Sequence, residues 1–250
     1  MQTRFQEFPV VAALDRDLQE KGNYCGQCLR PTHPEMSLQL PKDSSCNTFH
    51  LTYCSKACMI ASNNQSHRLL FSSDSPLPPE VPIPSSPPEV KEARRAAQIN
   101  FVEFLKKGDR ASPLLIACFI ARQVEAELQK MVEATTSSTK KSNLIENDFT
   151  DSDGIDHGYG LGDHMERLRY LEILPDKEEV ALLSAVLQLA LPGLEGFVQE
   201  ERHAILLGKV IYNAFGVCYN GGRDDRVCHW LFCPLINQPS CCIADADMPS

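Results

Sequence analysis

Four cysteines near the start of the chain have the types and spacing of metal ligands. Cys25 and Cys28 form a C-x2-C pair in "YCGQC", and Cys54 and Cys58 form a C-x3-C pair in "YCSKAC". A short cysteine knuckle holds two thiolates at the separation that tetrahedral zinc requires, and a second pair from across a loop completes a four-sulfur site. Buried structural thiols are the alternative, but paired knuckles favour the metal. The spacing therefore predicts one zinc site at these four residues.

The chemistry expected of this site is structural. Neither knuckle contains a glutamate or aspartate that would serve as a catalytic base, so an open, catalytic coordination position has no support. Because unfolded ligands do not preorganise a metal site, zinc binding here would contribute folding energy to a segment with few large apolar residues.

These residues resemble a MYND finger, in which "YCGQC", "YCSKAC" and a trailing His67 follow one another. In that family two zinc ions bind in interleaved order, and the resemblance implies that the four cysteines above hold the first ion. It implies Cys46 and His67 for the second ion, with His50 as a substitute. This chain departs from the family there, because Phe49 stands where the second pair has its other cysteine. Structural zinc almost always takes four ligands, so we expect one occupied site and one degenerate site. For His50 a solvated or core-satisfied imidazole is the alternative.

The elements that must position these residues are mostly helical by their apolar period. Residues 76–90 include seven prolines, which favours an extended connector over an SH3-type ligand. Residues 135–162 are expected to form a polar surface loop. Helices are expected over five ranges: 89–108, 112–134, 163–174, 176–193 and 194–217. Within the last of these, His203 is expected to be a surface histidine with a polar partner.

The order of the parts resembles the SET and MYND domain proteins, chiefly the fungal branch. The likeness covers residues 8 to about 226 and includes "PLLIACFIARQVEAEL" and "LLGKVIYNAFGVCYNGG". It implies an α+β fold, mostly helical here, with a MYND-type zinc finger inserted in an incomplete SET-domain framework. It implies the following units: a remnant of the N-terminal SET part (1–23), the finger (24–70), a Pro-rich connector (71–90), the helical SET insert region (91–226) and an atypical C-terminal tail (227–250).

The resemblance also implies a function, S-adenosylmethionine-dependent methylation of protein lysines. Asn213 in "YNAFGV" matches an asparagine that lies at the cofactor pocket of that family; a helix-terminal asparagine that caps carbonyls is the alternative. The family's catalytic half needs an N-H-S-C-x-P-N motif and a later tyrosine-bearing segment. Nothing here matches, and "LINQPSCC" (235–242) has no histidine. We therefore expect a chain truncated at both ends of the SET domain and inactive by itself, without a catalytic residue to name.

The C-terminal tail differs in composition from the rest of the chain. Residues 227–250 hold four cysteines and the only tryptophan, without period or caps. Val227 and Cys228 can be encoded by GTATGT, a common intron donor sequence. One hypothesis is therefore that translation runs through an unspliced intron, which would make these cysteines accidental.

Charge and hydropathy exclude some of the remaining classes of function. The 250 residues carry a net charge of −9 with scattered basic residues, which argues against nucleic acid as a partner. No apolar run approaches a membrane span and no signal peptide opens the chain, so an intracellular location, cytoplasm or nucleus, is expected. The partner is then a protein lysine substrate or another protein. The second function class is a zinc-dependent adaptor that binds Pro-rich partner segments. S-adenosylmethionine binding distinguishes the two classes, because a methyltransferase-family protein should bind this cofactor and an adaptor should not.

Overall fold

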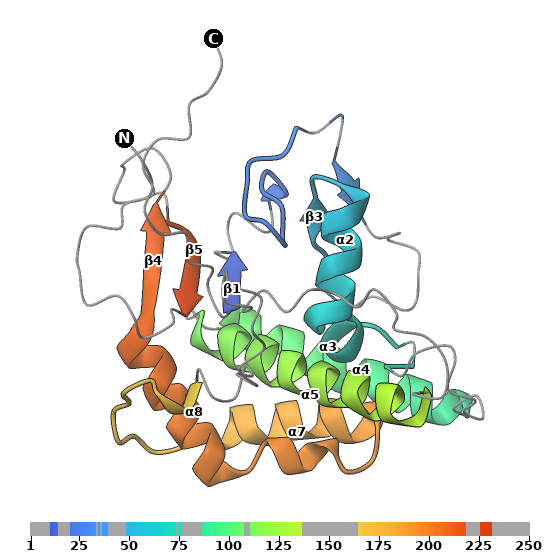
Figure 1. The fold of residues 1–250 in the computed structure, drawn as a ribbon, viewed down its shortest axis with the longest axis vertical. Coiled ribbons are helices and arrows are strands. Elements are labelled where there is room, and N and C mark those ends of the chain that lie inside the picture. Colours follow the sequence, from blue (N-terminus) through green and yellow to red (C-terminus); the bar gives the residue numbers. More distant parts are fainter. Residues whose placement is uncertain are drawn as a thin grey trace.

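The protein is a mostly helical body joined to a small sheet and a finger (Figure 1). The computed structural model describes residues 11–14, 21–33, 35, 37–39, 49–73, 75–76, 87–107, 111–136, 165–218 and 226–231. In chain order the elements are β1 (Val11–Leu14), β2 (Leu38–Gln39), β3 (Thr52–Tyr53), α2 (Lys56–Ser62), η1 (Asn63–His67), α3 (Arg68–Phe71), α4 (Pro88–Lys107), α5 (Ser112–Thr136), α7 (Lys177–Ala190), η2 (Leu194–Phe197), α8 (Glu200–Asn213), β4 (Ala214–Cys218) and β5 (Arg226–Leu231).

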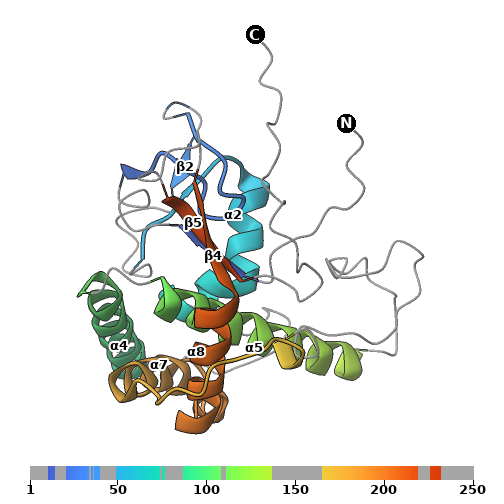
Figure 2. The same ribbon diagram turned by 90° about the vertical axis from the view of Figure 1, so that its left-hand side faces the viewer.

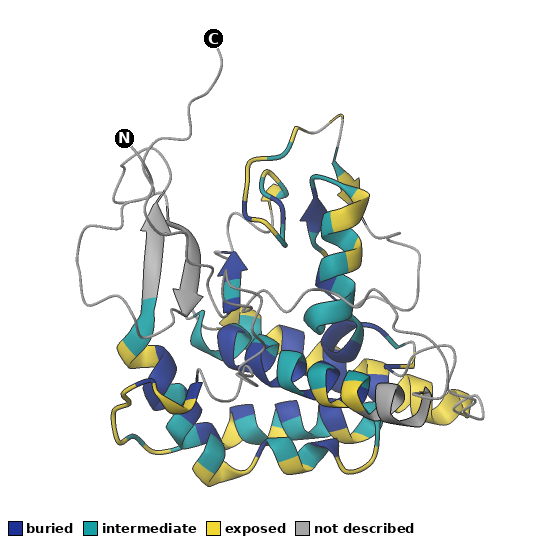
Figure 3. Cartoon of the chain, viewed as in Figure 1, coloured by how far each residue is buried: buried dark blue, intermediate teal, exposed yellow. Residues whose placement is uncertain are grey.

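The helical body is built from α4, α5, α7 and α8. α4 packs on α7, and α8 packs on both α5 and α7. Buried residues gather on α5 and on the inward-facing sides of α7 and α8 (Figure 3). The core includes Phe101 of α4, Ile116 and Ile120 of α5, and Leu183 and Leu187 of α7, all completely buried. The helices expected over 89–108, 112–134 and 176–193 are thereby confirmed, within a few residues at their ends.

The starts of two of these helices follow from local sequence. In α7 the Asp176 carboxylate accepts hydrogen bonds from the amides of Glu178 (3.0 Å) and Glu179 (3.1 Å), which satisfies two donors of the first turn. In α5, Pro113 follows Ser112 at the first turn, where a missing amide donor costs nothing.

A three-stranded antiparallel sheet has the order β1-β5-β4, so β5 is central (Figure 1). The strand β4 continues directly from the end of α8 (Figure 2). Leu231 of β5 lies opposite Val11 of β1 on one side and Ala214 of β4 on the other. The sheet therefore joins a strand that precedes the finger to two strands that follow the last helix. Residues from 227 onward were predicted to be a tail without regular structure, but residues 226–231 form this central strand. Residues 232–250 lie outside the described part of the chain.

The helix expected over 163–174 is wrong. Among the described residues of this range only Met165 and Glu166 are helical, and residues 169–176 have no regular structure. Two of their backbone groups pair with α8 instead: the Leu171 amide donates to the Gly208 carbonyl (3.4 Å), and the Arg169 carbonyl accepts from Asn213 Nδ2 (2.7 Å). The buried Lys209 ammonium also donates to the Met165 carbonyl. Contacts with a helix that comes much later in the chain replace the local helical bonds.

The last expected helix, 194–217, is also corrected. Residues 194–197 form a 3-10 turn, and α8 ends at Asn213, where β4 begins to pair with β5. His203, expected at the surface, is completely buried in α8, with its Nε2 3.0 Å from Glu179 Oε1 in α7. The prediction of a polar partner is confirmed, and the surface location is wrong.

We predict that Gly208→Ala destabilises the fold. A Cβ at this position would lie 2.1 Å from the Leu171 carbonyl oxygen, so the segment at Leu171 must move away from α8. Crowding of this kind costs about 1–3 kcal/mol, which exceeds the roughly 1 kcal/mol that alanine gains over glycine in a helix. Urea unfolding should show a lower midpoint. Gly196→Ala, where a Cβ meets nothing within 4 Å, is the control; equal midpoints for both variants would contradict the packing described.

Candidate metal centre

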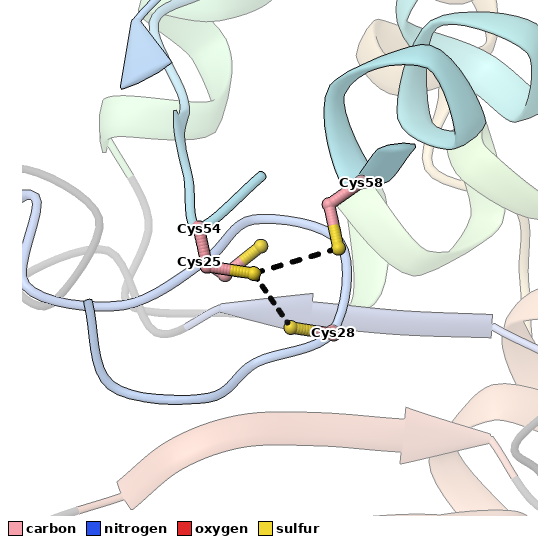
Figure 4. A group of neighbouring side chains, drawn as sticks. All are labelled: Cys25, Cys28, Cys54 and Cys58. Atoms are coloured by element: carbon pink, nitrogen blue, oxygen red, sulfur yellow. Dashed lines mark hydrogen bonds between the residues drawn. The ribbon is translucent and has the colours of Figure 1, made fainter. Parts of the chain in front are cut away.

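Four cysteine sulfurs meet between the knuckle and the start of α2 (Figure 4). The Sγ atoms of Cys25, Cys28, Cys54 and Cys58 all lie within 4.8 Å of one another. Cys28 Sγ is 3.5 Å from Cys54 Sγ, which in turn is 3.6 Å from Cys58 Sγ. All four are free thiols. The structure therefore brings together the four residues that the sequence spacing predicts.

The first pair is held by a tight backbone turn. The Cys25 amide donates to the Arg30 carbonyl (2.8 Å), and the Leu29 amide donates to the Cys25 carbonyl (2.9 Å). Leu29 has φ of +62°, an unusual value for a residue with a side chain, which the turn imposes. The Gly26 amide donates to the Thr52 carbonyl (2.8 Å) and fastens the knuckle to β3.

The second pair straddles the start of a helix. Cys54 directly follows β3, Ser55 is the N-cap of α2, and the Cys58 amide donates to the Ser55 Oγ (3.2 Å). The sequence "CSKAC" thus places one thiol before the cap and the other in the first helical turn. The partial positive charge at a helix N-terminus favours a thiolate there.

The thiols differ in their acidity. Burial raises the pKa of Cys28 and that of Cys58. Burial also acts to raise the pKa of Cys25, but hydrogen bonds from the backbone at Cys28 and Cys54 lower it overall. Because the raised values disfavour several thiolates side by side, a bound cation would supply the charge that makes all four ionise.

The donor set fits one tetrahedral metal ion. With Zn–S bonds of about 2.3 Å, the edge of a tetrahedron of sulfurs is about 3.8 Å, close to the two sulfur separations of 3.5 and 3.6 Å. Four cysteines use every position of such an ion, which is typical of structural zinc and leaves none open for a substrate. The four thiols could therefore hold one metal ion such as zinc, in a closed site.

The residues expected at a second ion are not part of this cluster. His67 is buried at the end of η1, with its ring centroid 5.5 Å from that of Phe71. Neither ring nitrogen has a hydrogen-bond partner among the described residues. Burial, with a smaller contribution from His50, lowers the pKa of His67 to about 4, so the ring is neutral at pH 7. Cys46 lies outside the described residues, and the degenerate second site stays a prediction.

Asn213, the candidate cofactor residue, lies at the end of α8 beside β4. Its Nδ2 donates to the carbonyls of Lys209 and Arg169, both at 2.7 Å. The structure therefore has the alternative arrangement, in which Asn213 caps carbonyls at the end of the helix. Neither hydrogen bond involves the Asn213 Oδ1.

Sequence reasoning missed the polar residues that attach the finger to the body. Arg68 in α3 pairs with Glu125 in α5 at 3.0 Å, and Arg94 and Gln98, buried on α4, donate to carbonyls of residues 68, 69 and 72. One signal was available: Arg94 and Gln98 are polar residues at helical spacing close to the apolar stripe of Ala97 and Phe101.

The chain was compared with protein-family models, curated proteins and solved structures. None of them matches it. The metal assignment therefore depends on the geometry of the four cysteines. Within the part of the chain that the structure describes, no helix combines the length and apolar character that crossing a bilayer requires.

We predict that Cys58→Ser abolishes stoichiometric zinc binding. A serine hydroxyl replaces one of four thiolates, so the remaining three cannot complete the tetrahedron. The measurement is zinc content per chain after dialysis against a weak chelator, with about one equivalent expected for the wild type. Cys118→Ser, on α5 and outside the cluster, should retain the wild-type content. His67→Asn should retain it too; a wild-type content of about two equivalents that falls to one in that variant would show that the second site is occupied.

Proposed function

We propose that this chain is a member of the SET and MYND protein lysine methyltransferase family that binds S-adenosylmethionine around a zinc-stabilised finger. The observation that carries the proposal is the sheet. β1 comes before the finger, and β4 and β5 come after α8, yet the three pair in the order β1-β5-β4. The finger and the helical body thus lie together between two strands of one sheet, and an interrupted strand framework of this kind supports the family resemblance.

The position of Asn213 supports the same proposal. It is the last residue of α8, immediately before β4, so its side chain lies at the edge where the helical body meets the sheet. With both Nδ2 hydrogens donated to carbonyls, only Oδ1 fits the cofactor, as an acceptor for the ammonium of its amino acid end. The cofactor, when bound, supplies a sulfonium methyl group for transfer to a nucleophile.

Binding without turnover is the expected behaviour of the chain. Methyl transfer requires the sulfonium and the lysine nitrogen in one aligned channel. The sequence has no N-H-S-C-x-P-N motif to line that channel. We therefore propose that this chain does not methylate a protein lysine by itself.

The test is calorimetric titration of S-adenosylmethionine into zinc-loaded protein. Saturable binding is expected, and Asn213→Ala should weaken it by roughly 10- to 100-fold, because a hydrogen bond to a charged group contributes about 1.5–3 kcal/mol. The variant also loses two backbone contacts, so its unfolding midpoint is measured in the same buffer. A wild-type protein that contains zinc but releases no heat of binding would contradict the proposed cofactor.

A second candidate is a zinc-dependent adaptor that binds Pro-rich segments of partner proteins. Among the described residues of the finger, Leu38 of β2 (39%) and Ile60 of α2 (48%) are exposed large apolar side chains. Exposed apolar residues close to a structural zinc offer a surface for the rings of a polyproline segment. The chain's own Pro-rich residues 76–88 would compete for this surface.

If the adaptor function holds, a proline-rich peptide should bind the zinc-loaded protein, and Ile60→Asp should abolish that binding without changing zinc content. Fluorescence anisotropy of a labelled peptide measures this. The control is Ile99→Asp on α4, a similarly exposed apolar residue (43%) outside the finger. Equal loss in both variants would show that the peptide binds non-specifically.

A further inference from the structure

One uninterrupted helical stretch leads from the metal centre into the main core. α2, η1 and α3 follow one another from Lys56 to Phe71, and the residues at the two junctions keep αR backbone angles. We call this stretch the 56–71 helix; at 1.5 Å per residue it is roughly 24 Å long. Its first turn contains Cys58, and its last residues, Leu69, Leu70 and Phe71, are buried in the core.

The middle of the 56–71 helix is fastened on both sides. The η1 segment packs against α5, and Ser66 of η1 acts to lower the pKa of Cys118 of α5, which burial raises to about 11. On the finger side, Gln65 Oε1 accepts from Gln27 Nε2 in the knuckle (2.9 Å), and Ser62 Oγ accepts from the hydroxyl of Tyr53 (3.1 Å). The helix thus contacts the knuckle and the body at once.

Its C-terminal end is capped by α4. Arg94 Nη2 donates to the Arg68 carbonyl (3.3 Å) and the Leu69 carbonyl (3.1 Å), and Gln98 Nε2 donates to the Ser72 carbonyl (2.8 Å). Both side chains are buried, Arg94 at 3% and Gln98 at 0% exposure. The last carbonyls of a helix have no partner within it, so if the 56–71 helix moved away, Arg94 and Gln98 would lose the hydrogen bonds to these carbonyls.

An ion pair fastens the same end to α5. Arg68 Nη2 lies 3.0 Å from Glu125 Oε2, and the Glu125 side chain is only 5% exposed. Burial raises the pKa of Glu125, while Arg68 acts to lower it. Removal of one partner from a buried pair leaves an uncompensated charge, which is strongly destabilising. The body therefore depends on the 56–71 helix being in place.

We infer that the 56–71 helix couples metal binding at the four cysteines to the folding of the helical body. The Arg68–Glu125 pair and the Arg94 bonds form only when the metal holds the start of this helix, so metal loss releases α4 and α5 as well as the finger. The inference rests on the metal centre and does not depend on cofactor binding. Coupling is reciprocal, so weakening the distant pair must also weaken metal binding.

Hydrogen exchange on the wild-type chain tests the first half of the inference. Amide protection is measured with zinc bound and after chelation, with metal content counted on the same samples. We expect chelation to remove protection from α4 and α5 together with residues 24–62. Loss confined to residues 24–62 would overturn the inference while leaving the metal centre intact. A chain that binds no zinc at all would overturn both.

The reciprocal effect is tested with Glu125→Gln. Competition with a chromophoric chelator should show a zinc Kd raised by about 5- to 150-fold, the usual range of coupling between distant sites. The matched control is Glu127→Gln on the same helix, whose pair with Lys130 is exposed; its Kd should stay within about twofold of the wild type. Wild-type affinity in Glu125→Gln would overturn the coupling. If that variant does not fold, the exchange experiment on the wild type decides.

Discussion

Four thiols held within 4.8 Å of one another are the constraint on which the finger depends, because thiolates at that distance repel one another unless a cation lies between them. The knuckle turn, the β3 strand and the N-cap at Ser55 each position one or two of these sulfurs. The described residues of the finger form two short strands and include few buried apolar side chains, so they have little other stabilisation of their own. Its order would therefore come from a bound metal ion at one end and from the core at the other.

The sheet explains how such a finger belongs to a larger fold. β1 leads into it, and the chain returns to β1 only after α8, through β4 and β5. The finger and the helices thus form one continuous segment between β1 and β4, and the 56–71 helix connects the finger to the helices directly. This arrangement places α8, with Asn213 at its end, beside the strands, where the proposed cofactor would meet both units.

Spacing, apolar period and capping patterns predicted much of this structure. They failed where contacts between residues far apart in the sequence determine the local conformation. The four-cysteine site follows from spacing, and α4, α5 and α7 follow from apolar period and caps. Residues 169–174 favour helix locally, but Gly208 admits the Leu171 carbonyl so closely that the segment runs along α8 instead. β4 and β5 are strands because each finds a partner across the sheet. The Arg68–Glu125 pair joins residues 57 positions apart, which no local pattern indicates.

X-ray absorption at the zinc edge of the purified chain tests whether one zinc ion is held by four sulfurs. We predict four sulfur neighbours at about 2.3 Å from the zinc, with no lighter atom bound to it. Nitrogen or oxygen neighbours at about 2.0–2.1 Å in place of any of these sulfurs would contradict the closed four-cysteine centre, and with it the structural role assigned to the finger.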